Sequence, residues 1–399
     1  MTLLLPRIFA IAVAFLAFVS CEKQDDQSLE FKLEEVLKSN FTEAYADQFA
    51  GKPAGVFLAI KNADTSLFVQ HNLDGVMTES THFKGASTTK TFTSAAILWL
   101  HQEGELDIDD KLTDLIPGKT ISYLPQTPDY DVPYKSEITI RQLLNHRAGV
   151  FDVTNSKIPD SINAPYAGMI YPDYLKDQFG ETYTFTFDAL VFPVVEHQLS
   201  YFPPGTGMHY SNTGYNLLGK IVERVSGLSL SAFKKQFLLD PLELNDTHFE
   251  DVGTNIHLPA PFIDSYLLLD GQVIDITEDN LSSAIAEGNI VTTPSDIAEW
   301  AWYLYGTNSI LNTSMQNMMT EPLETGEHHV LYGLGTQMYP EEIGVGHNGA
   351  RAAFMTIMRY HPATQTSYVV SSNTLNVDDF EQEGEMLNQI LRDAIEVMK

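Results

Sequence analysis

Two residues that could perform nucleophilic chemistry stand three apart in the segment Ser87-Thr88-Thr89-Lys90. If a helix begins here, Ser87 and Lys90 share one face of it, and Ser87 lies at the N-terminus, where backbone N–H groups stabilise developing negative charge. A serine hydroxyl needs a base to remove its proton, and a lysine whose pKa is lowered by burial can be that base. Taken alone, the pattern is more typical of a serine that caps a helix and a solvated lysine.

A second polar group, Tyr210-Ser211-Asn212, comes directly before an expected helix. Tyr210 could carry a proton if a neighbouring lysine stabilised its phenolate, whereas Asn212 could bind a substrate amide or orient Lys90. By itself this group is more typical of a buried tyrosine followed by a helix cap.

A third group, His347-Asn348-Gly349, lies in strand-like sequence and is followed by Ala350. A donor on a strand edge can bind a carboxylate, and Gly349 lets the backbone approach a ligand closely. The alternative is a glycine-rich turn between edge strands.

The three groups together, in this order, resemble the penicillin-recognising serine hydrolase family. The resemblance is to the branch with class C β-lactamases, D-alanyl-D-alanine carboxypeptidases and related esterases, which carries Ser-x-x-Lys, Tyr-x-Asn and Lys/His-x-Gly. The class A pattern has Ser-Asp-Asn in second place, so Tyr210 separates the two patterns. Further segments that resemble the family lie at 138–150, 203–221, 288–296 and 332–335, and the resemblance covers roughly residues 30–398.

The resemblance implies a role for each matching residue. Ser87 would be the acylated nucleophile, Lys90 and Tyr210 the pair that transfers protons, and Asn212 would position both the substrate amide and Lys90. His347 and Gly349 would line the substrate-binding edge. The backbone N–H groups of Ser87 and Ala350 would bind the oxyanion. The resemblance implies no metal and no organic cofactor.

Helices and strands must bring these groups together, and the patterns predict them at both ends of the chain. Strands are expected at 55–60 and 66–70 and as short β-branched segments between 332 and 371, with loops at 108–137 and an irregular aromatic stretch from 153 that becomes helical near Ala189. This layout is α+β: an α/β sandwich with an antiparallel sheet from both chain ends, flanking helices and an all-helical lobe. The helices are expected at 31–41, 88–102, 138–145, 213–225, 231–238, 294–305 and 379–398.

Composition excludes several classes of function. The 399 residues include 23 Lys and Arg against 53 Asp and Glu, a formal charge of −30, which argues against nucleic acid as a partner. A single cysteine cannot form an intramolecular disulfide or a multi-cysteine metal site. Because Lys90, Tyr210 and His347 are basic or phenolic, we expect a local positive site on an acidic surface.

The first residues resemble an export signal rather than part of the fold. Arg7 precedes an apolar run that ends at Ser20, directly before Cys21, the only cysteine. Phe18-Val19-Ser20-Cys21 resembles a bacterial lipobox, although Phe18 stands where Leu is usual; the alternative is a plain signal peptide. We therefore expect a signal peptide at 1–20, a polar tether at 21–30 and the hydrolase domain at 31–399. Lipid on Cys21 would anchor the exported protein to the cell envelope, on the outer membrane.

Histidine at 347 is the informative departure, because class C β-lactamases usually carry Lys there. Histidine is mostly neutral at pH 7–8, which favours peptidase-like or esterase-like members acting on a peptide-like amide or an ester. The alternatives are a true class C-type β-lactamase and a catalytically silent surface-binding lipoprotein. We expect His146 to pack or cap rather than to catalyse, and His328-His329 not to bind metal, since adjacent side chains point apart. The substrate and the oligomeric state stay undetermined at this stage.

Overall fold

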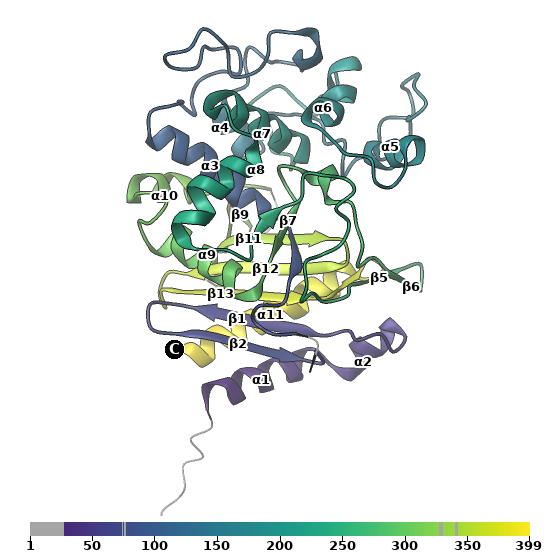
Figure 1. Ribbon diagram of the computed structural model, residues 1–399, viewed down its shortest axis with the longest axis vertical. Coiled ribbons are helices and arrows are strands. Elements are labelled where there is room, and N and C mark those ends of the chain that lie inside the picture. The colour runs from purple at the N-terminus through teal and green to yellow at the C-terminus, as the bar shows by residue number, and fades with distance from the viewer. Residues whose placement is uncertain (1–27, 74, 76, 327–329, 340–341) are drawn as a thin grey trace, which may run out of the picture.

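The computed structural model describes residues 28–73, 75, 77–326, 330–339 and 342–399. Its centre is an eight-stranded antiparallel sheet with the order β2-β1-β13-β12-β11-β10-β9-β8 (Figure 1). Strands from the two ends of the chain meet in it, because β1 pairs with β13. The strands are β1 Val56–Lys61, β2 Ser66–His71, β8 Leu323–Glu324, β9 Leu331–Tyr332, β10 Gln337–Tyr339, β11 Gly344–Arg351, β12 Phe354–His361 and β13 Thr366–Ser372.

Both faces of the sheet are buried, and the alternation of side chains along β1 decides which residue faces which layer. Val56 and Leu58 pack with α1 (Leu29–Asn40) and α11 (Phe380–Met398), which cover one face. Phe57 packs in a separate core cluster on the opposite face, which α9 (Pro294–Gly306) covers. This arrangement confirms the predicted α/β sandwich with its sheet built from both ends.

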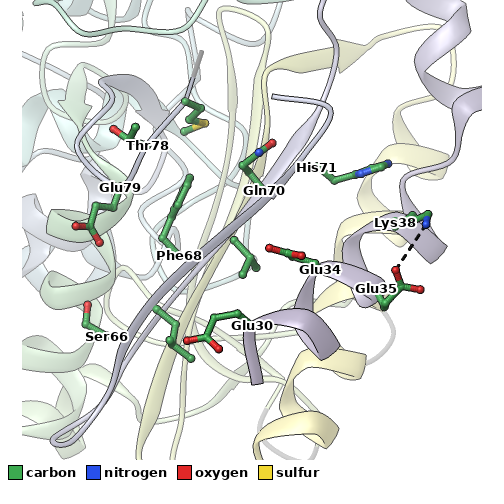
Figure 2. Close-up of a pocket in the computed structure, with 13 residues that line it drawn as sticks. Glu30, Glu34, Glu35, Lys38, Ser66, Phe68, Gln70, His71, Thr78 and Glu79 are labelled. Carbon is green, nitrogen blue, oxygen red and sulfur yellow. Dashed lines mark ion pairs between the residues drawn. The ribbon is translucent and has the colours of Figure 1, made fainter. Parts of the chain in front are cut away.

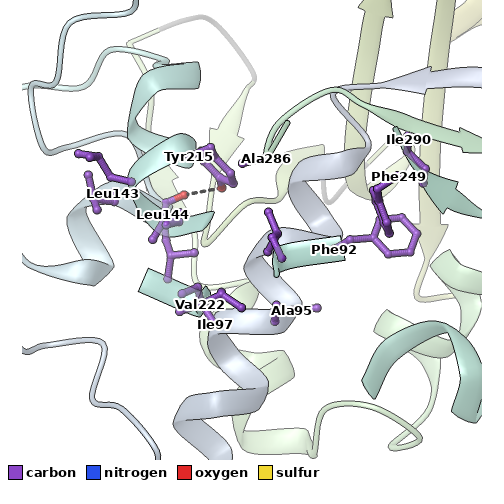
Figure 3. Packing of buried hydrophobic residues seen from close by; sticks show 14 of the residues in the cluster. Phe92, Ala95, Ile97, Leu143, Leu144, Tyr215, Val222, Phe249, Ala286 and Ile290 are labelled. Atoms are coloured by element: carbon purple, nitrogen blue, oxygen red, sulfur yellow. Dashed lines mark hydrogen bonds between the residues drawn. The ribbon is translucent and has the colours of Figure 1, made fainter. Parts of the chain in front are cut away.

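Most of the remaining helices form a lobe above the sheet in Figure 1. Its core is continuous with the α9 side of the sheet, where Phe92 stacks on Trp300 with ring centroids 3.8 Å apart. Tyr215 donates to the carbonyl of Leu144 over 3.0 Å and so ties two helices together (Figure 3). The lobe consists of α3 Thr89–Gln102, α4 Ile140–Leu144, α5 Tyr171–Phe179, α6 Phe187–Glu196, α7 Asn212–Ser226, α8 Leu230–Lys234 and α10 Thr313–Met319.

Two small sheets connect the lobe to the main sheet. The first has the order β3-β7-β4, and its strand β3 leads directly into the turn that carries Ser87. The second has the order β14-β5-β6, in which β14 and β5 are parallel. Their bounds are β3 Phe83–Ala86, β4 His248–Phe249, β5 Tyr266–Leu269, β6 Gln272–Asp275, β7 Ile290–Thr292 and β14 Thr374–Asn376.

The structure corrects several local expectations. Helix α1 begins at Leu29, inside the expected tether, because Ser28 caps it by accepting from the N–H of Phe31 over 3.2 Å. The aromatic stretch expected to be irregular contains α5, and α6 begins at Phe187, where Thr186 is the cap. The strands β3 and β7 were not anticipated within the central block. Residues 1–27 and 327–329, with the expected signal, Cys21 and His328-His329, lie outside the described residues.

Two further features of the described ranges concern surfaces. None of their helices has the length and apolar character needed to cross a membrane. A groove of about 750 Å³ between α1 and the edge strand β2 is lined by several glutamates, one of which, Glu35, forms an ion pair with Lys38 at 3.6 Å (Figure 2). Of the described residues that line this groove, none belongs to the three sequence motifs.

The C-terminal helix is fixed to the sheet by one buried carboxylate. Glu383 of α11 accepts from the hydroxyls of Ser372 and Thr374 over 2.6 and 2.8 Å and from the N–H of Asn376 over 2.7 Å. These three donors lie at the end of β13 and in β14, so a single side chain connects the helix to both strands.

We expect Glu383→Ala to lower the free energy of unfolding by about 3 kcal/mol or more, because each buried donor left unsatisfied costs about 1–3 kcal/mol. Urea unfolding followed by circular dichroism measures this loss. Glu381→Ala, at an exposed position of the same helix, is the control and should change stability by less than about 0.5 kcal/mol. Equal stabilities of the two variants would contradict the anchoring role.

Candidate active site

Ser87 occupies a tight turn between β3 and α3. The preceding residue, Ala86, has a φ of +51°, a left-handed conformation that is costly for a residue with a Cβ. The turn is held by Thr88 and Thr89, whose hydroxyls donate to the carbonyls of Gly85 and Ala86 over 2.8 and 2.7 Å. The cap position of α3 is Thr88 rather than Ser87, so the hydroxyl of Ser87 is not used to cap the helix.

Lys90 lies one turn into α3 and is fully buried. Its Nζ donates to Ser87 Oγ over 3.2 Å and to the backbone carbonyl of Glu287 over 3.1 Å. Burial, with a smaller contribution from Arg351, lowers the pKa of Lys90 to about 7, against the opposing charges of Glu287 and Asp152. A substantial fraction of Lys90 is therefore a neutral amine at pH 7, and that amine can accept the proton of the Ser87 hydroxyl.

Tyr210 lies beside this pair, and its ring packs against His146 with centroids 4.3 Å apart. Nζ of Lys90 lies over the ring face, 4.7 Å from its centroid. Burial raises the pKa of Tyr210 well above its usual value, and a hydrogen bond with Ser87 lowers it only in part. The free protein therefore holds Tyr210 as a phenol, not as the lysine-stabilised phenolate considered from the sequence.

Asn212 begins α7, but it does not contact Lys90 as the resemblance implied. Its Nδ2 donates to Thr154 Oγ1 over 2.8 Å, and that hydroxyl donates in turn to Asp152 Oδ1 over 2.8 Å. Its Oδ1 is buried, and no described residue donates to it. Asn212 is thus oriented by the Asp152 turn through Thr154.

His347 is buried in β11 and belongs to a chain of hydrogen bonds. His146 Nδ1 accepts from the N–H of Ser211 over 3.1 Å, so its Nε2 carries the proton and donates to the Tyr332 hydroxyl over 3.1 Å. The Tyr332 hydroxyl then donates to His347 Nε2 over 3.0 Å, and His347 Nδ1 donates to the carbonyl of Asn348. His146 packs against Tyr210 and links Ser211 to Tyr332, and its expected non-catalytic role stays a prediction.

His146 and His347, the two histidines of this hydrogen-bond network, are neutral. Burial and the neighbouring Lys90 lower the pKa of His347 to about 3 and that of His146 well below 6.5. A neutral His347 agrees with the expectation for pH 7–8, and His347 adds nothing to the expected local positive site, because burial removes its cationic form. The sequence supplied the residue types but not their burial.

Gly349 brings β11 against the nucleophile turn. A Cβ at this position would lie 2.5 Å from the carbonyl oxygen of Gly85 and 3.1 Å from the backbone nitrogen of Ser87. Only glycine allows this approach. Ala350, the next residue, lines the same cleft as Ser87.

We expect Gly349→Ala to lower kcat/KM by at least about 100-fold, because small displacements of reacting groups have costs of that size. The KM should change less than kcat, since the added methyl group displaces the Ser87 turn rather than filling the cleft. Steady-state kinetics on a chromogenic ester measure both constants. Gly384→Ala, where a Cβ meets nothing within 4 Å, is the matched control. Activity near that of the control would contradict the close approach.

The three motifs meet in a cleft of about 620 Å³ between the sheet and the lobe. Ser87, Tyr210, Asn212, His347 and Ala350 all line it, so the structure brings together residues far apart in the sequence. The cleft also contains residues that sequence reasoning missed, namely Asn155, Met208, Glu287, Arg351 and Phe380.

Two of these missed residues had a signal in the sequence. Glu287 directly precedes the family-like segment at 288–296, and Arg351 follows the third motif by two positions. Phe380 had none, because it comes from the helix at the far end of the chain. No group of three or more His, Cys, Asp or Glu among the described residues could hold a metal ion.

A serine beside a buried lysine, in a cleft between an antiparallel sheet and a helical lobe, defines the class of penicillin-recognising serine hydrolases. A family model described as Beta-lactamase matches residues 43–391. The chain belongs to this family.

Among curated relatives, Penicillin-binding protein 4* of Bacillus subtilis (strain 168) is 26% identical over 318 residues, 75% of this chain and 62% of that protein. Protein flp of Staphylococcus aureus (strain MW2) is 26% identical over 330 residues, 80% of this chain and 59% of that protein. The matched region thus spans about three fifths of the length of these relatives.

Solved structures share the fold over nearly their whole length. The D-stereospecific amidohydrolase from Streptomyces sp. has a TM-score of 0.71 and 22% identity, with 91% of this chain and 98% of that chain covered. The D-amino acid amidase from Ochrobactrum anthropi SV3 has a TM-score of 0.67 and 25% identity, with 90% and 99% covered.

Proposed function

We propose that the protein cleaves an amide or ester bond through a covalent acyl-enzyme on Ser87. The observation that carries this proposal is the 3.2 Å contact between Lys90 Nζ and Ser87 Oγ, with the pKa of Lys90 lowered to about 7. The base is therefore in contact with the nucleophile and partly deprotonated at neutral pH.

The proposed reaction begins when Lys90 takes the hydroxyl proton of Ser87 as Oγ attacks the substrate carbonyl carbon. The oxyanion is bound by the backbone N–H groups of Ser87 and Ala350. Collapse of this intermediate breaks the bond to the leaving group, which receives a proton through Lys90 and Tyr210. Water then attacks the acyl ester and gives a proton to the same pair. Collapse of this second intermediate releases the acid, and Ser87 Oγ regains its proton.

We further propose that the activity is of the D-alanyl-D-alanine carboxypeptidase or esterase type, with little or no turnover of β-lactams. Neutral His347 supports this, because its pKa of about 3 leaves no charge at the position where class C β-lactamases usually carry lysine. The unused acceptor Oδ1 of Asn212 supports a substrate with an N–H near the scissile bond. The D-amino acid amidase with the same fold is consistent with an amide substrate.

Labelling with a fluorophosphonate and a fluorescent penicillin tests the proposal, followed by turnover of p-nitrophenyl esters, D-amino-acid peptides and nitrocefin. We expect covalent labelling, ester or peptide turnover, and nitrocefin hydrolysis at pH 7.5 that is slow or absent. Efficient nitrocefin hydrolysis would instead identify a β-lactamase. A folded protein that no acylating probe labels would be a silent binding protein.

We also propose that the protein is exported and lipid-anchored at Cys21. The support is the sequence 18–21 and the apolar run before it. Incorporation of a labelled fatty acid that is lost in Cys21→Ser tests this, and incorporation that persists in the variant would contradict it.

A further inference from the structure

Residues along β11 line the active-site cleft. His347, Gly349 and Arg351 lie two apart, so their side-chain positions are on one face of the strand. Gly349 stands against the Ser87 turn, and His347 and Arg351 line the cleft on either side of it. At about 3.3 Å per residue, the two side chains flank the nucleophile at roughly 7 Å along the strand in each direction.

The two sides differ in chemistry. On the His347 side lie Tyr332 and Tyr210, whose ring centroid is 6.2 Å from that of His347. These groups are neutral, and Tyr210 belongs to the pair that protonates the leaving group in the proposed reaction. The leaving group therefore occupies the His347 side, and the acyl part of the substrate extends toward Arg351.

Arg351 is the only Lys or Arg among the described residues that line the cleft. Its side chain is 29% exposed and contributes to the lining of the cleft. Its Nη2 donates to Ser283 Oγ over 2.7 Å and lies 3.5 Å from Asp279 Oδ2.

Asp279 does not neutralise this arginine fully. The same carboxylate lies 3.5 Å from Lys176 Nζ, and Arg351, Lys176 and Lys84 together hold the pKa of Asp279 below its usual value. Glu287, the one acid among the described residues that line the cleft, is buried, and its Oε2 accepts from the N–H of Ala286 over 2.9 Å. Burial raises the pKa of Glu287 to about 7, so it is only partly charged.

The turn that follows β11 fixes the position of Arg351. Ala352 and Ala353 have φ values of +48° and +58°, the conformation of a two-residue hairpin turn that glycine or asparagine usually fills. Ser265 Oγ donates to the carbonyl of Ala352 over 3.0 Å and holds the turn in place. Arg351 is thus presented by a rigid backbone, as recognition of a specific group requires.

We propose that Arg351 binds a carboxylate on the acyl part of the substrate. The preferred substrates are then esters or amides of an acid that carries a second carboxylate a few bonds from the scissile carbonyl. Arginine suits this role because its planar guanidinium matches carboxylate geometry. The inference rests on the proposed function, since it assigns part of the substrate of the same site.

Two esters of equal acyl length test it: 4-nitrophenyl pentanoate, which is neutral, and mono-4-nitrophenyl glutarate, which is anionic. We expect the wild-type protein to have a kcat/KM at least about 10-fold higher for the glutarate, as a charge-assisted hydrogen bond provides. Arg351→Gln should lose that preference, so that the ratio of the two kcat/KM values falls to near one, and Arg351→Lys should retain part of it. Arg392→Gln, on the surface of α11, is the control for removal of one positive charge.

The outcomes separate the inference from the function it rests on. If neither ester is hydrolysed and Ser87 is not labelled, the proposed function fails. If pentanoate is hydrolysed but glutarate is not preferred, or if Arg351→Gln lowers both rates equally, only the inference is overturned. The wild-type ratio of the two rates decides the matter even if Arg351→Gln does not fold.

Discussion

Ser87→Ala is expected to abolish covalent labelling and to lower kcat/KM by at least about 10⁴-fold, the scale seen when a nucleophile of this kind is removed. The neighbouring hydroxyls of Thr88, Thr89 and Thr91 cannot replace it, because they donate to backbone carbonyls of the same turn and helix. The Ser87 side chain contacts Lys90 and Tyr210 rather than the hydrophobic core, so the variant should remain folded.

Intact-mass spectrometry after fluorophosphonate treatment measures the labelling, and circular dichroism confirms the fold. Ser295→Ala, near the start of α9, is the control and should label like the wild type. Full labelling of folded Ser87→Ala would place the nucleophile elsewhere and would overturn the proposed mechanism.

Lys90→Met should have the second largest effect, a fall in kcat/KM of about 10³-fold, because general-base catalysis contributes roughly 10²–10⁴. The substitution removes the amine that accepts the Ser87 proton but keeps most of the buried volume. The lost amine donates to Ser87 Oγ and to the Glu287 carbonyl, so circular dichroism must first establish that the variant is folded.

The same lysine sets the pH dependence of the wild-type protein. Its pKa is lowered to about 7, so the active, neutral amine is lost as the pH falls below 7. We expect kcat/KM to fall about tenfold per pH unit below that midpoint and to level off above pH 8. Stopped-flow or steady-state rates between pH 5.5 and 9 on one ester measure the profile, and a flat profile from pH 6 to 8 would contradict the assignment.

The titration of Glu287 must be distinguished from that of Lys90, because the pKa of Glu287 is also raised to about 7. The charge of the Glu287 carboxylate raises the pKa of Lys90. Glu287→Gln should therefore keep the rise in rate and move its midpoint to lower pH. Disappearance of the rise in this variant would assign it to Glu287 instead.

The sequence contains enough information to predict the sandwich and the motif residues. The periodic segments near both ends predict the sheet and its flanking helices, and Ser87, Lys90, Tyr210 and His347 do line one cleft or contact a residue that does. What spacing cannot predict is burial, which depends on the whole fold. For that reason the sequence could not show how far burial lowers the pKa of His347, although His347 does line the predicted cleft.

The errors in detail have the same origin. Asn212 was expected to contact Lys90, but Thr154 binds its amide, and this pairing joins two loops whose relation is set by tertiary structure. Helix α5 was missed because it spans only 9 residues within an aromatic-rich stretch, where Tyr171 and Tyr174 both pack on Tyr166 outside the helix. Arg351 follows the third motif by two positions. Its role depends on which side of Ser87 it lies, and spacing in the sequence does not show this.

The contact between Gly349 and the Ser87 turn also governs when the protein can become active during folding. The nucleophile and its base come from the first quarter of the chain, whereas β11, which passes beside them, comes from the last. A chain still being synthesised cannot assemble the site, because the pairing of β1 with β13 must wait for residues near its end. Such long-range pairings slow folding and leave apolar strands exposed until it is complete. The architecture thus makes activity a late property of chain synthesis.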